Sequence, residues 1–315
     1  ERVESVRAGA PIAMNLYRRP GAAEGELFFK IFHAESPLAL SDVLPMLEHM
    51  GLKVVAERPF EIAGGAGQSV FAHDFEMTAA GAEVDLGAVR AKFQDAFQRI
   101  WSGEAESDGL NRLIMRAGFD WREVVILRTY VRYLRQVRAP YSQALVEDTL
   151  AKHAPIARLL VNLFEARLDP DRVDSTRGDG IVKEIEKALD GVTSLEEDSI
   201  LRRLLNLIAC TLRTNHFQRD AKGTPKPYLS VKLDSHKIDD LPLPRPMVEI
   251  FVYSAHMEGV HLRGGKVARG GIRWSDRRED FRTEILGLMK AQMVKNAVIV
   301  PVGSKGGFVL KRPPA

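Results

Sequence analysis

The strongest constraint on the fold lies in residues 262–312, where two short glycine motifs bracket a helical and a strand-like segment. An Arg-Gly-Gly triplet occupies 269–271, and a Lys-Gly-Gly triplet occupies 305–307. Glycine has no Cβ and adopts positive φ without penalty, so paired glycines let backbone approach a ligand closely. The adjacent cations suit a ligand with more than one negative charge. We therefore expect a binding site in this stretch.

The segment between the triplets predicts a helix followed by a strand. An N-cap at Ser275-Asp276 would start the helix, and its apolar face would comprise Phe281, Ile285, Leu288, Met289 and Met293. Lys295 flanks that face, whereas Lys290 points to solvent. The apolar run 297–300 predicts a buried strand that ends at Pro301. The loop 303–307 would then present Lys305 at the strand's carboxyl end, where open α/β sheets bind ligands.

Composition predicts an ordinary globular chain with two or three domains. It has 315 residues, 45% hydrophobic and 28% charged content, and a net charge of +3. This small charge favours neither a nucleic-acid nor a membrane partner, and we see no apolar run near the roughly 20 residues of a membrane span. The single cysteine, Cys210, is expected to be a buried core residue and fits a cytoplasmic location. His256 and His261 match no metal-binding spacing, so we expect no metal site.

The first third of the chain predicts a small α+β unit. Residues 1–25 are expected to form an irregular linker or edge segment. Within 26–105, the sequence predicts a strand at 27–32, a helix at 36–49, a hairpin of strands at 52–62 and 69–77, and a helix at 84–101. Pro59 predicts that the strand at 52–62 lies at an edge of the sheet or contains a bulge. This β-α-β-β-α order resembles the ACT regulatory module. A structural or oligomerisation role is favoured over amino-acid sensing, which stays open as the alternative.

Residues 106–219 have helical periodicity almost throughout. Helices are predicted near 108–117, 120–137, 142–167, 179–190 and 195–214. Their arginines recur at helical spacing and predict a solvated stripe, with a nucleic-acid surface as the alternative; they are Arg128, Arg132, Arg135 and Arg138. From 220 onward, prolines punctuate predicted strands at 228–233 and 248–253. The expected fold class is therefore α+β and multidomain: an ACT-like module, a helical region, and the first part of an α/β domain over 220–315.

The motifs in 266–308 carry a resemblance to glutamate dehydrogenases. That family has a Lys-Gly-Gly-Ile-Arg-type segment, a helix ending in lysine, and a Pro-containing Lys-Gly-Gly loop, in this order. The present chain resembles the large multidomain NAD-dependent enzymes of bacteria. It differs from the small hexameric enzymes in carrying Arg269 where they have lysine, and in a slightly shorter segment from Lys295 to Lys305.

The resemblance implies a site for L-glutamate, which is oxidised to 2-oxoglutarate and ammonium with NAD as hydride acceptor. Two carboxylates need at least two fixed cations, and the family pattern gives these roles to Arg269 and Lys295. Lys305 would be the general base, since a lysine held among other cations in a partly buried site gives up its proton readily. Gly270, Gly271 and Gly306 would let backbone groups touch the substrate.

The resemblance also sets limits on these 315 residues. The sequence contains neither G-x-G-x-x-G on a βα turn nor a Walker A loop. We therefore expect the NAD-binding domain and a catalytic aspartate beyond Ala315, no cofactor-binding residues before it, and no turnover by residues 1–315 alone. A homo-oligomer is expected.

Two other functions are weighed against this one. In the first, the ACT-like unit senses an amino acid and the rest is scaffold. In the second, the basic, glycine-rich segment binds nucleic acid, although it lacks the interleaved aromatic residues that stack on bases. Nearby charges are assigned structural roles: Arg277, Arg278 and Arg282 are expected to pair with Glu279, Asp280 and Glu284.

Overall fold

The structure is a computed structural model that describes residues 1–34, 36–63, 69–79, 84–172, 175–295 and 302–313. For Ser175 and residues 293–295 it describes only the backbone. The chain divides into two compact units, Glu1–Val124 and Val125–Ala315. Each unit is described by itself.

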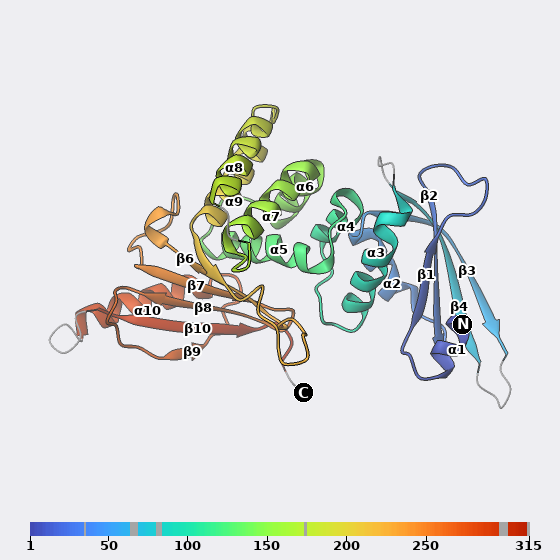
Figure 1. Cartoon of the computed structure of the whole chain (residues 1–315). Coiled ribbons are helices and arrows are strands. Elements are labelled where there is room, and N and C mark those ends of the chain that lie inside the picture. Colours follow the sequence, from blue (N-terminus) through green and yellow to red (C-terminus); the bar gives the residue numbers. More distant parts are fainter. Residues whose placement is uncertain (35, 64–68, 80–83, 173–174, 296–301, 314–315) are drawn as a thin grey trace. The chain divides into compact units, whose positions relative to one another are not determined.

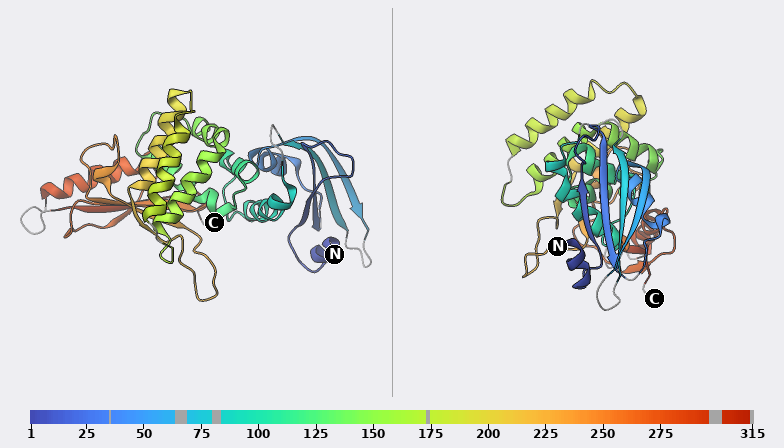
Figure 2. Two further views of the ribbon diagram at one scale, coloured as in Figure 1. Left: turned by 45° about the horizontal axis from the view of Figure 1, so that its top comes forward. Right: turned by 90° about the vertical axis from the view of Figure 1, so that its right-hand side faces the viewer.

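The first unit is a four-stranded antiparallel sheet with two helices on one face (Figures 1 and 2). Its strands lie in the order β1-β2-β4-β3. In chain order the elements are α1 (Arg2–Arg7), β1 (Ala13–Tyr17), β2 (Glu26–Ala34), α2 (Leu40–His49), β3 (Leu52–Ile62), β4 (Val70–Ala79) and α3 (Leu86–Trp101). The predicted β-α-β-β-α order is therefore confirmed.

Two expectations in this unit need correction. Residues 1–25 are not simply irregular, because they contain α1 and β1, and β1 pairs with β2 from Ala13↔Phe32 to Tyr17↔Phe28. A strand of five residues that forms by pairing with a neighbouring strand is too short to show a clear alternation in its own sequence. Helix α2 begins at Leu40, later than Ser36-Pro37 suggested. The edge position of β3 is confirmed, with its bulge at Val54/Ala56 instead of Pro59.

Aromatic packing holds α3 against the sheet. Phe29 of β2 is fully buried and meets Phe93 and Phe97 of α3 edge-on, with ring centroids 5.2 and 5.0 Å apart. Asp85 caps α3 by accepting hydrogen bonds from the backbone N–H groups of Gly87 and Ala88. A short turn, Gly109–Asn111, and α4 (Arg112–Ala117) complete the unit, and α4 ends at Gly118 with φ +63°.

Helices α5 to α9 follow the predicted pattern closely. They are α5 (Trp121–Gln136), α6 (Gln143–Lys152), α7 (Ala154–Leu168), α8 (Ser175–Leu189) and α9 (Leu195–Ala209). The predicted segment 142–167 is divided at His153, because a proline occupies the first turn of α7. The predicted helix 195–214 is also too long: it ends at Ala209, and Thr211–Thr214 form β5. Cys210 is buried, as expected, and burial raises the pKa of its thiol.

The arginines at 128–138 form a solvated stripe only in part, because Arg135 and Arg138 are exposed whereas Arg132 is only 15% exposed. Arg128 is only 1% exposed. The next three lie near carboxylates elsewhere in the second unit: Arg132 near Glu258 (Nε–Oε1 3.7 Å), Arg135 with Glu279, and Arg138 with Asp280 (Nη2–Oδ2 2.7 Å). Helical spacing gives the face of the helix but not what covers it, which is why the prediction holds for Arg135 and Arg138 and fails for Arg128 and Arg132. In the structure Arg135 and Arg138 join the end of α5, and the turn after it, to the segment before α10.

The second unit contains a six-stranded sheet in the order β5-β6-β7-β8-β10-β9 (Figure 1). Its later elements are β6 (Leu229–Leu233), β7 (Val248–Tyr253), β8 (Met257–Arg263), β9 (Ile272–Trp274), α10 (Phe281–Lys295) and β10 (Ser304–Leu310). Strands β6 and β7 match the prediction within one residue. Helices α5 and α10 lie on the same face of this sheet, since Tyr133 of α5 and Arg282 of α10 both bond to Glu249 of β7. No helix in the described residues is long and apolar enough to cross a membrane.

Candidate functional site

Lys305 lies within a strand, which corrects the predicted loop over 303–307. It is the second residue of β10 and pairs with Leu262 of antiparallel β8. The apolar run expected just before it, 297–300, and Pro301 lie outside the described residues. A Lys-Gly-Gly sequence has little strand propensity, but strands on both sides supply its hydrogen bonds. Tertiary pairing therefore overrides the local preference.

The structure places the Arg269 segment beside Lys305. Strand β9 runs parallel to β10 with Gly306 opposite Ile272, and an isolated bridge sets Arg269 opposite Gly303. The backbone N–H of Ser304 donates to Arg269 O (3.0 Å), and the N–H of Gly306 donates to Gly271 O (3.0 Å). The two glycine motifs thus lie side by side, the first directly before β9 and the second within β10. Sequence reasoning put these motifs in one site but did not foresee this ladder.

The glycines serve two different purposes. A Cβ at Gly307 would lie 2.2 Å from Ile285 Cδ1 of α10, and one at Gly270 would lie 1.5 Å from Ser304 O. At Gly306 it would meet Ile272 and His261 at 3.1 and 3.2 Å. Gly270 and Gly307 therefore need glycine for packing within the chain, whereas at Gly306 the neighbouring side chains would have to move by a few tenths of an ångström. Only at Gly271, among these four, does a Cβ meet nothing within 4 Å, so the surroundings leave space for another molecule there.

Helix α10 starts later than predicted and is anchored differently. It begins at Phe281, while Ser275 closes a preceding turn by accepting a hydrogen bond from the N–H of Arg277. Phe281, Ile285 and Met289 are buried as expected, and Lys290 is exposed. Leu286 is also buried, Leu288 is half-buried, and the side chains of Met293 and Lys295 lie outside the described residues. The place of Lys295 in the site therefore stays a prediction.

The expected local pairing of Arg282 is wrong. Arg282 is 1% exposed and binds Glu249, with Nε 2.8 Å from Oε2. Burial alone would lower the pKa of Arg282, but the hydrogen bonds and charge of Glu249 outweigh it and the pKa is raised. Arg277 pairs with Asp280 as expected. Hydrogen bonds from Arg277 and Arg138 lower the pKa of Asp280 to about 2.

The other acidic residues near α10 also have partners that the sequence did not suggest. Glu284 binds Arg273 (Oε1–Nε 2.9 Å) and accepts a hydrogen bond from Ser275. Glu279 pairs with Arg135 of α5. These contacts satisfy carboxylates that would otherwise compete for nearby cations.

Gln292 is a residue of the candidate site that sequence reasoning missed. With its amide nitrogen turned toward the sheet, this α10 side chain donates to Arg269 O (2.9 Å) and Ser304 O (2.6 Å). It therefore holds together the two backbone segments that carry Arg269 and Lys305. A single glutamine on a helix gives no sequence signal for such a contact.

The two cations are available to a ligand. Arg269 is exposed and Lys305 is half-buried, and neither has a carboxylate partner in the part of the chain that the structure describes. A half-buried cation without such a partner favours an anionic ligand. The described residues hold no group of three or more His, Cys, Asp or Glu side chains that could bind a metal ion.

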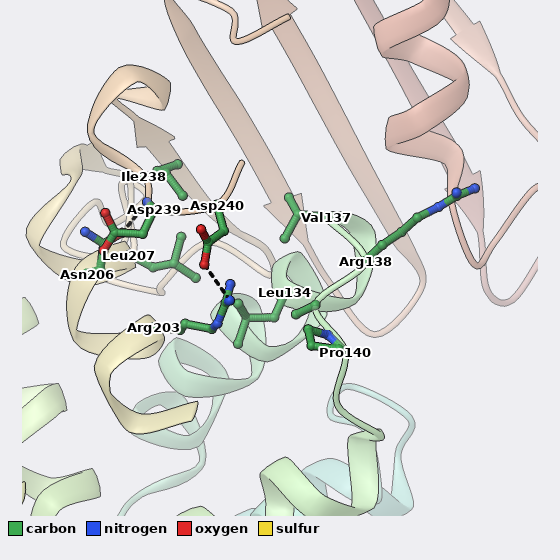
Figure 3. A pocket seen from close by; sticks show the side chains of 11 residues that line it. Leu134, Val137, Arg138, Pro140, Arg203, Asn206, Leu207, Ile238, Asp239 and Asp240 are labelled. Atoms are coloured by element: carbon green, nitrogen blue, oxygen red, sulfur yellow. Dashed lines mark hydrogen bonds and ion pairs between the residues drawn. The ribbon is translucent and has the colours of Figure 1, made fainter. Parts of the chain in front are cut away.

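The described surface of the second unit is hollowed in several places. One hollow, of about 200 Å³, is an apolar recess lined by Ile250, Val252, His261, Ile272 and Phe308, and it adjoins the Lys-Gly-Gly motif because Gly306 and Gly307 also line it. Burial, together with the charge of Arg263, lowers the pKa of His261. A second hollow, of about 100 Å³, lies between α5, α9 and the 238–240 loop. Figure 3 shows the Arg203–Asp240 ion pair beside this second hollow and Arg138 pointing away from it.

Family models of glutamate dehydrogenases match three parts of the chain. Residues 184–315 match the model "Bacterial NAD-glutamate dehydrogenase, catalytic domain". Residues 105–170 match "Glutamate dehydrogenase, helical motif 3", and residues 11–89 match "Glutamate dehydrogenase, ACT3 domain". Their order along the chain agrees with the observed fold.

Three curated relatives are named NAD-specific glutamate dehydrogenases. The chain is 52% identical to an NAD-specific glutamate dehydrogenase of Halomonas elongata and 50% identical to one of Pseudomonas aeruginosa, over 97% and 96% of its length. It is 48% identical over 88% of its length to one of Mycobacterium tuberculosis. The chain belongs to this bacterial NAD-glutamate dehydrogenase family, and it spans about a fifth of the length of these relatives (19%, 19% and 18%).

Proposed function

We propose that the full-length protein oxidises L-glutamate to 2-oxoglutarate and ammonium, with NAD accepting the hydride, and that Arg269 and Lys305 are part of its substrate site. The observation that supports this most directly is the parallel pairing of the 269–274 segment with β10. It brings a cation and an unobstructed glycine, both directly before β9, beside the second cation on β10. The names of the relatives support the reaction and its nicotinamide specificity.

Each residue has a distinct role in this proposal. Arg269 and Lys295 hold the two carboxylates of glutamate, because each carboxylate needs a charged donor once water is displaced. Gly271 leaves space for the substrate to approach the backbone. Lys305 takes a proton during the conversion of the amine to the ketone. No residue of this chain is assigned to NAD.

A charge-retaining substitution tests the role of Lys305. In the full-length protein, Lys305→Arg keeps a positive charge but removes a group that can lose its proton at neutral pH. Loss of a general base lowers kcat by roughly 10²- to 10⁴-fold. Lys290→Ala is the matched control, because Lys290 is an exposed lysine of α10.

The outcomes separate two uses of the lysine. If Lys305 is the general base, both Lys305→Ala and Lys305→Arg lose kcat while glutamate binding is retained, and Lys290→Ala remains active. If Lys305→Arg restores turnover, the lysine only holds charge and the base is elsewhere. Absence of glutamate-dependent NADH formation by the unmodified full-length protein would refute the proposed reaction itself.

The ACT-like unit has a second possible use. The match of residues 11–89 to the ACT3 model supports its architecture. We infer no ligand for it, and amino-acid sensing stays a prediction that calorimetry against amino acids would test. Assembly into a homo-oligomer is likewise part of the proposal.

A further inference from the structure

We propose that Gln136 and Tyr133 of α5 are positioning residues for the substrate site, because they fix the helix α10 that spans from α5 to Arg269 and Lys305. The inference rests on the proposed function only for its kinetic consequence. It concerns side chains outside the glycine motifs, in the region matched by the helical-motif model.

Gln136 caps α10 from another helix. Its Oε1 accepts a hydrogen bond from the N–H of Arg282 (3.2 Å), and its Nε2 donates to Arg278 O (2.9 Å). The first N–H groups of a helix have no partner within the helix, so a buried helix end needs an acceptor from elsewhere. Gln136 is 1% exposed, and water does not readily replace it.

Tyr133 lies three residues before Gln136, on the same face of α5, and also holds the start of α10. Its hydroxyl donates to Glu249 Oε2 (3.0 Å), and Glu249 binds Arg282 of α10. All three side chains are at most 1% exposed. A buried ion pair adds little stability over apolar residues of similar volume, but its fixed geometry specifies one arrangement. Its value here is therefore orientation of the first turn of α10.

The far part of α10 transmits this orientation to the site. Ile285 packs against Gly307, two residues after Lys305, and Gln292 bonds to the carbonyls of Arg269 and Ser304. Arg282 and Gln292 are ten residues apart, or about 15 Å along the helix axis. A tilt at the first turn thus displaces the group that aligns the two strands.

Ion pairs at the surface also connect the end of α5 to the residues directly before α10. Arg135 pairs with Glu279, and Arg138 pairs with Asp280 directly before α10. Arg138 holds a left-handed backbone conformation (φ 59°), which is unfavourable for a residue with a Cβ. Glycine would relieve that strain but would lose the contact with Asp280.

The test compares two buried tyrosines of α5 in the full-length protein. Tyr133→Phe removes the hydroxyl that binds Glu249, whereas Tyr130→Phe removes one that binds Thr211 Oγ1 (2.7 Å) in β5. Both tyrosines are fully buried, so similar losses of thermal stability are expected. Gln136→Met supplies the second test variant, because it keeps the volume and removes the cap.

Two measurements are made on each variant. Steady-state kinetics should show kcat/KM for glutamate falling roughly three- to tenfold or more in Tyr133→Phe and Gln136→Met, since small misplacements near reacting groups carry large rate costs. Tyr130→Phe should retain the original value. Amide hydrogen exchange should accelerate in residues 281–292 in the first two variants and not in the control.

The outcomes distinguish this inference from the proposed reaction. If the unmodified protein turns over glutamate but Tyr133→Phe and Tyr130→Phe have equal kcat/KM values, the positioning role is overturned and the reaction stands. If the unmodified protein has no such activity, the reaction fails, and hydrogen exchange alone decides whether α5 fixes α10. Unchanged exchange in 281–292 would then refute the inference as well.

Discussion

Each unit contains a buried carboxylate with a tyrosine and an arginine, but the two clusters differ in their surroundings. In the first unit, Asp74 of β4 accepts hydrogen bonds from the Tyr17 hydroxyl (2.9 Å) and from Arg19 (3.0 Å), with Lys30 3.4 Å away. The side chains of Arg19 and Lys30 are 36% and 31% exposed. Glu249 in the second unit has Arg282 at 2.8 Å and Tyr133 at 3.0 Å.

The comparison shows what full burial changes for a carboxylate that has a tyrosine and an arginine as partners. Asp74 lies on the sheet face away from α3, where its cations reach it from the solvent side. If one of them leaves, another cation and water remain to replace it. Glu249 lies between a sheet and two helices, and each of its contacts is an element-to-element connection. The first cluster is therefore tolerant of change, and the second fixes the positions of α5 and α10.

The largest expected effect comes from removing the enclosed arginine. Arg282→Met in the full-length protein leaves Glu249 charged and buried, which costs about 3–5 kcal/mol of unfolding free energy. Native-state hydrogen exchange in β7 and α10 would measure it. The double variant Glu249→Leu with Arg282→Met should recover most of the loss, because no unpaired charge remains. A loss below about 1 kcal/mol for Arg282→Met would remove the contrast between the clusters.

An intermediate effect is expected at high pH. Burial, and then the charge of Glu249, raise the pKa of Tyr133 well above its usual value of 10. The folded protein thus keeps this proton while the unfolded chain releases it, so stability falls as pH rises above about 10, by up to about 1.4 kcal/mol per pH unit. Unfolding of the second unit by urea between pH 9 and 11.5 would show the slope. Tyr133→Phe should reduce it, and an unchanged slope would contradict the assignment.

The smallest effect is expected in the first unit. Arg19→Met removes a partly exposed cation from Asp74, but Tyr17 and Lys30 remain, so the loss of unfolding free energy should be much smaller than that of Arg282→Met. Hydrogen exchange in β2 and β4 would measure this loss, which is then compared with the loss measured for Arg282→Met in β7 and α10. A loss equal to that of Arg282→Met would show that exposure does not separate the two clusters. The removed contact with the Phe28 ring, 3.8 Å from the guanidinium carbon, contributes to the same small loss.

The predictions from sequence succeeded where structure follows local pattern. The helices of the middle region, the order of elements in the ACT-like unit and strand β7 each carry their own periodicity over five or more residues. The boundaries failed where a neighbour decides them: β1, β5 and β9 are short strands, and β10 contains a glycine pair. Helix α10 begins at Phe281 because Gln136, from a distant helix, caps it.

By itself, the sequence determined where glycine pairs and adjacent cations occur and in which order, because these features constrain backbone and charge locally, and from them we predicted the site. Only the tertiary structure decided that Lys305 belongs to a strand, that Gly307 serves packing while Gly271 stays open, and that Gln292 bonds to the backbone of Arg269 and Ser304. The physical reason is that these roles depend on atoms brought together from separate elements. The type of a residue does not by itself specify which residue of another element will contact it.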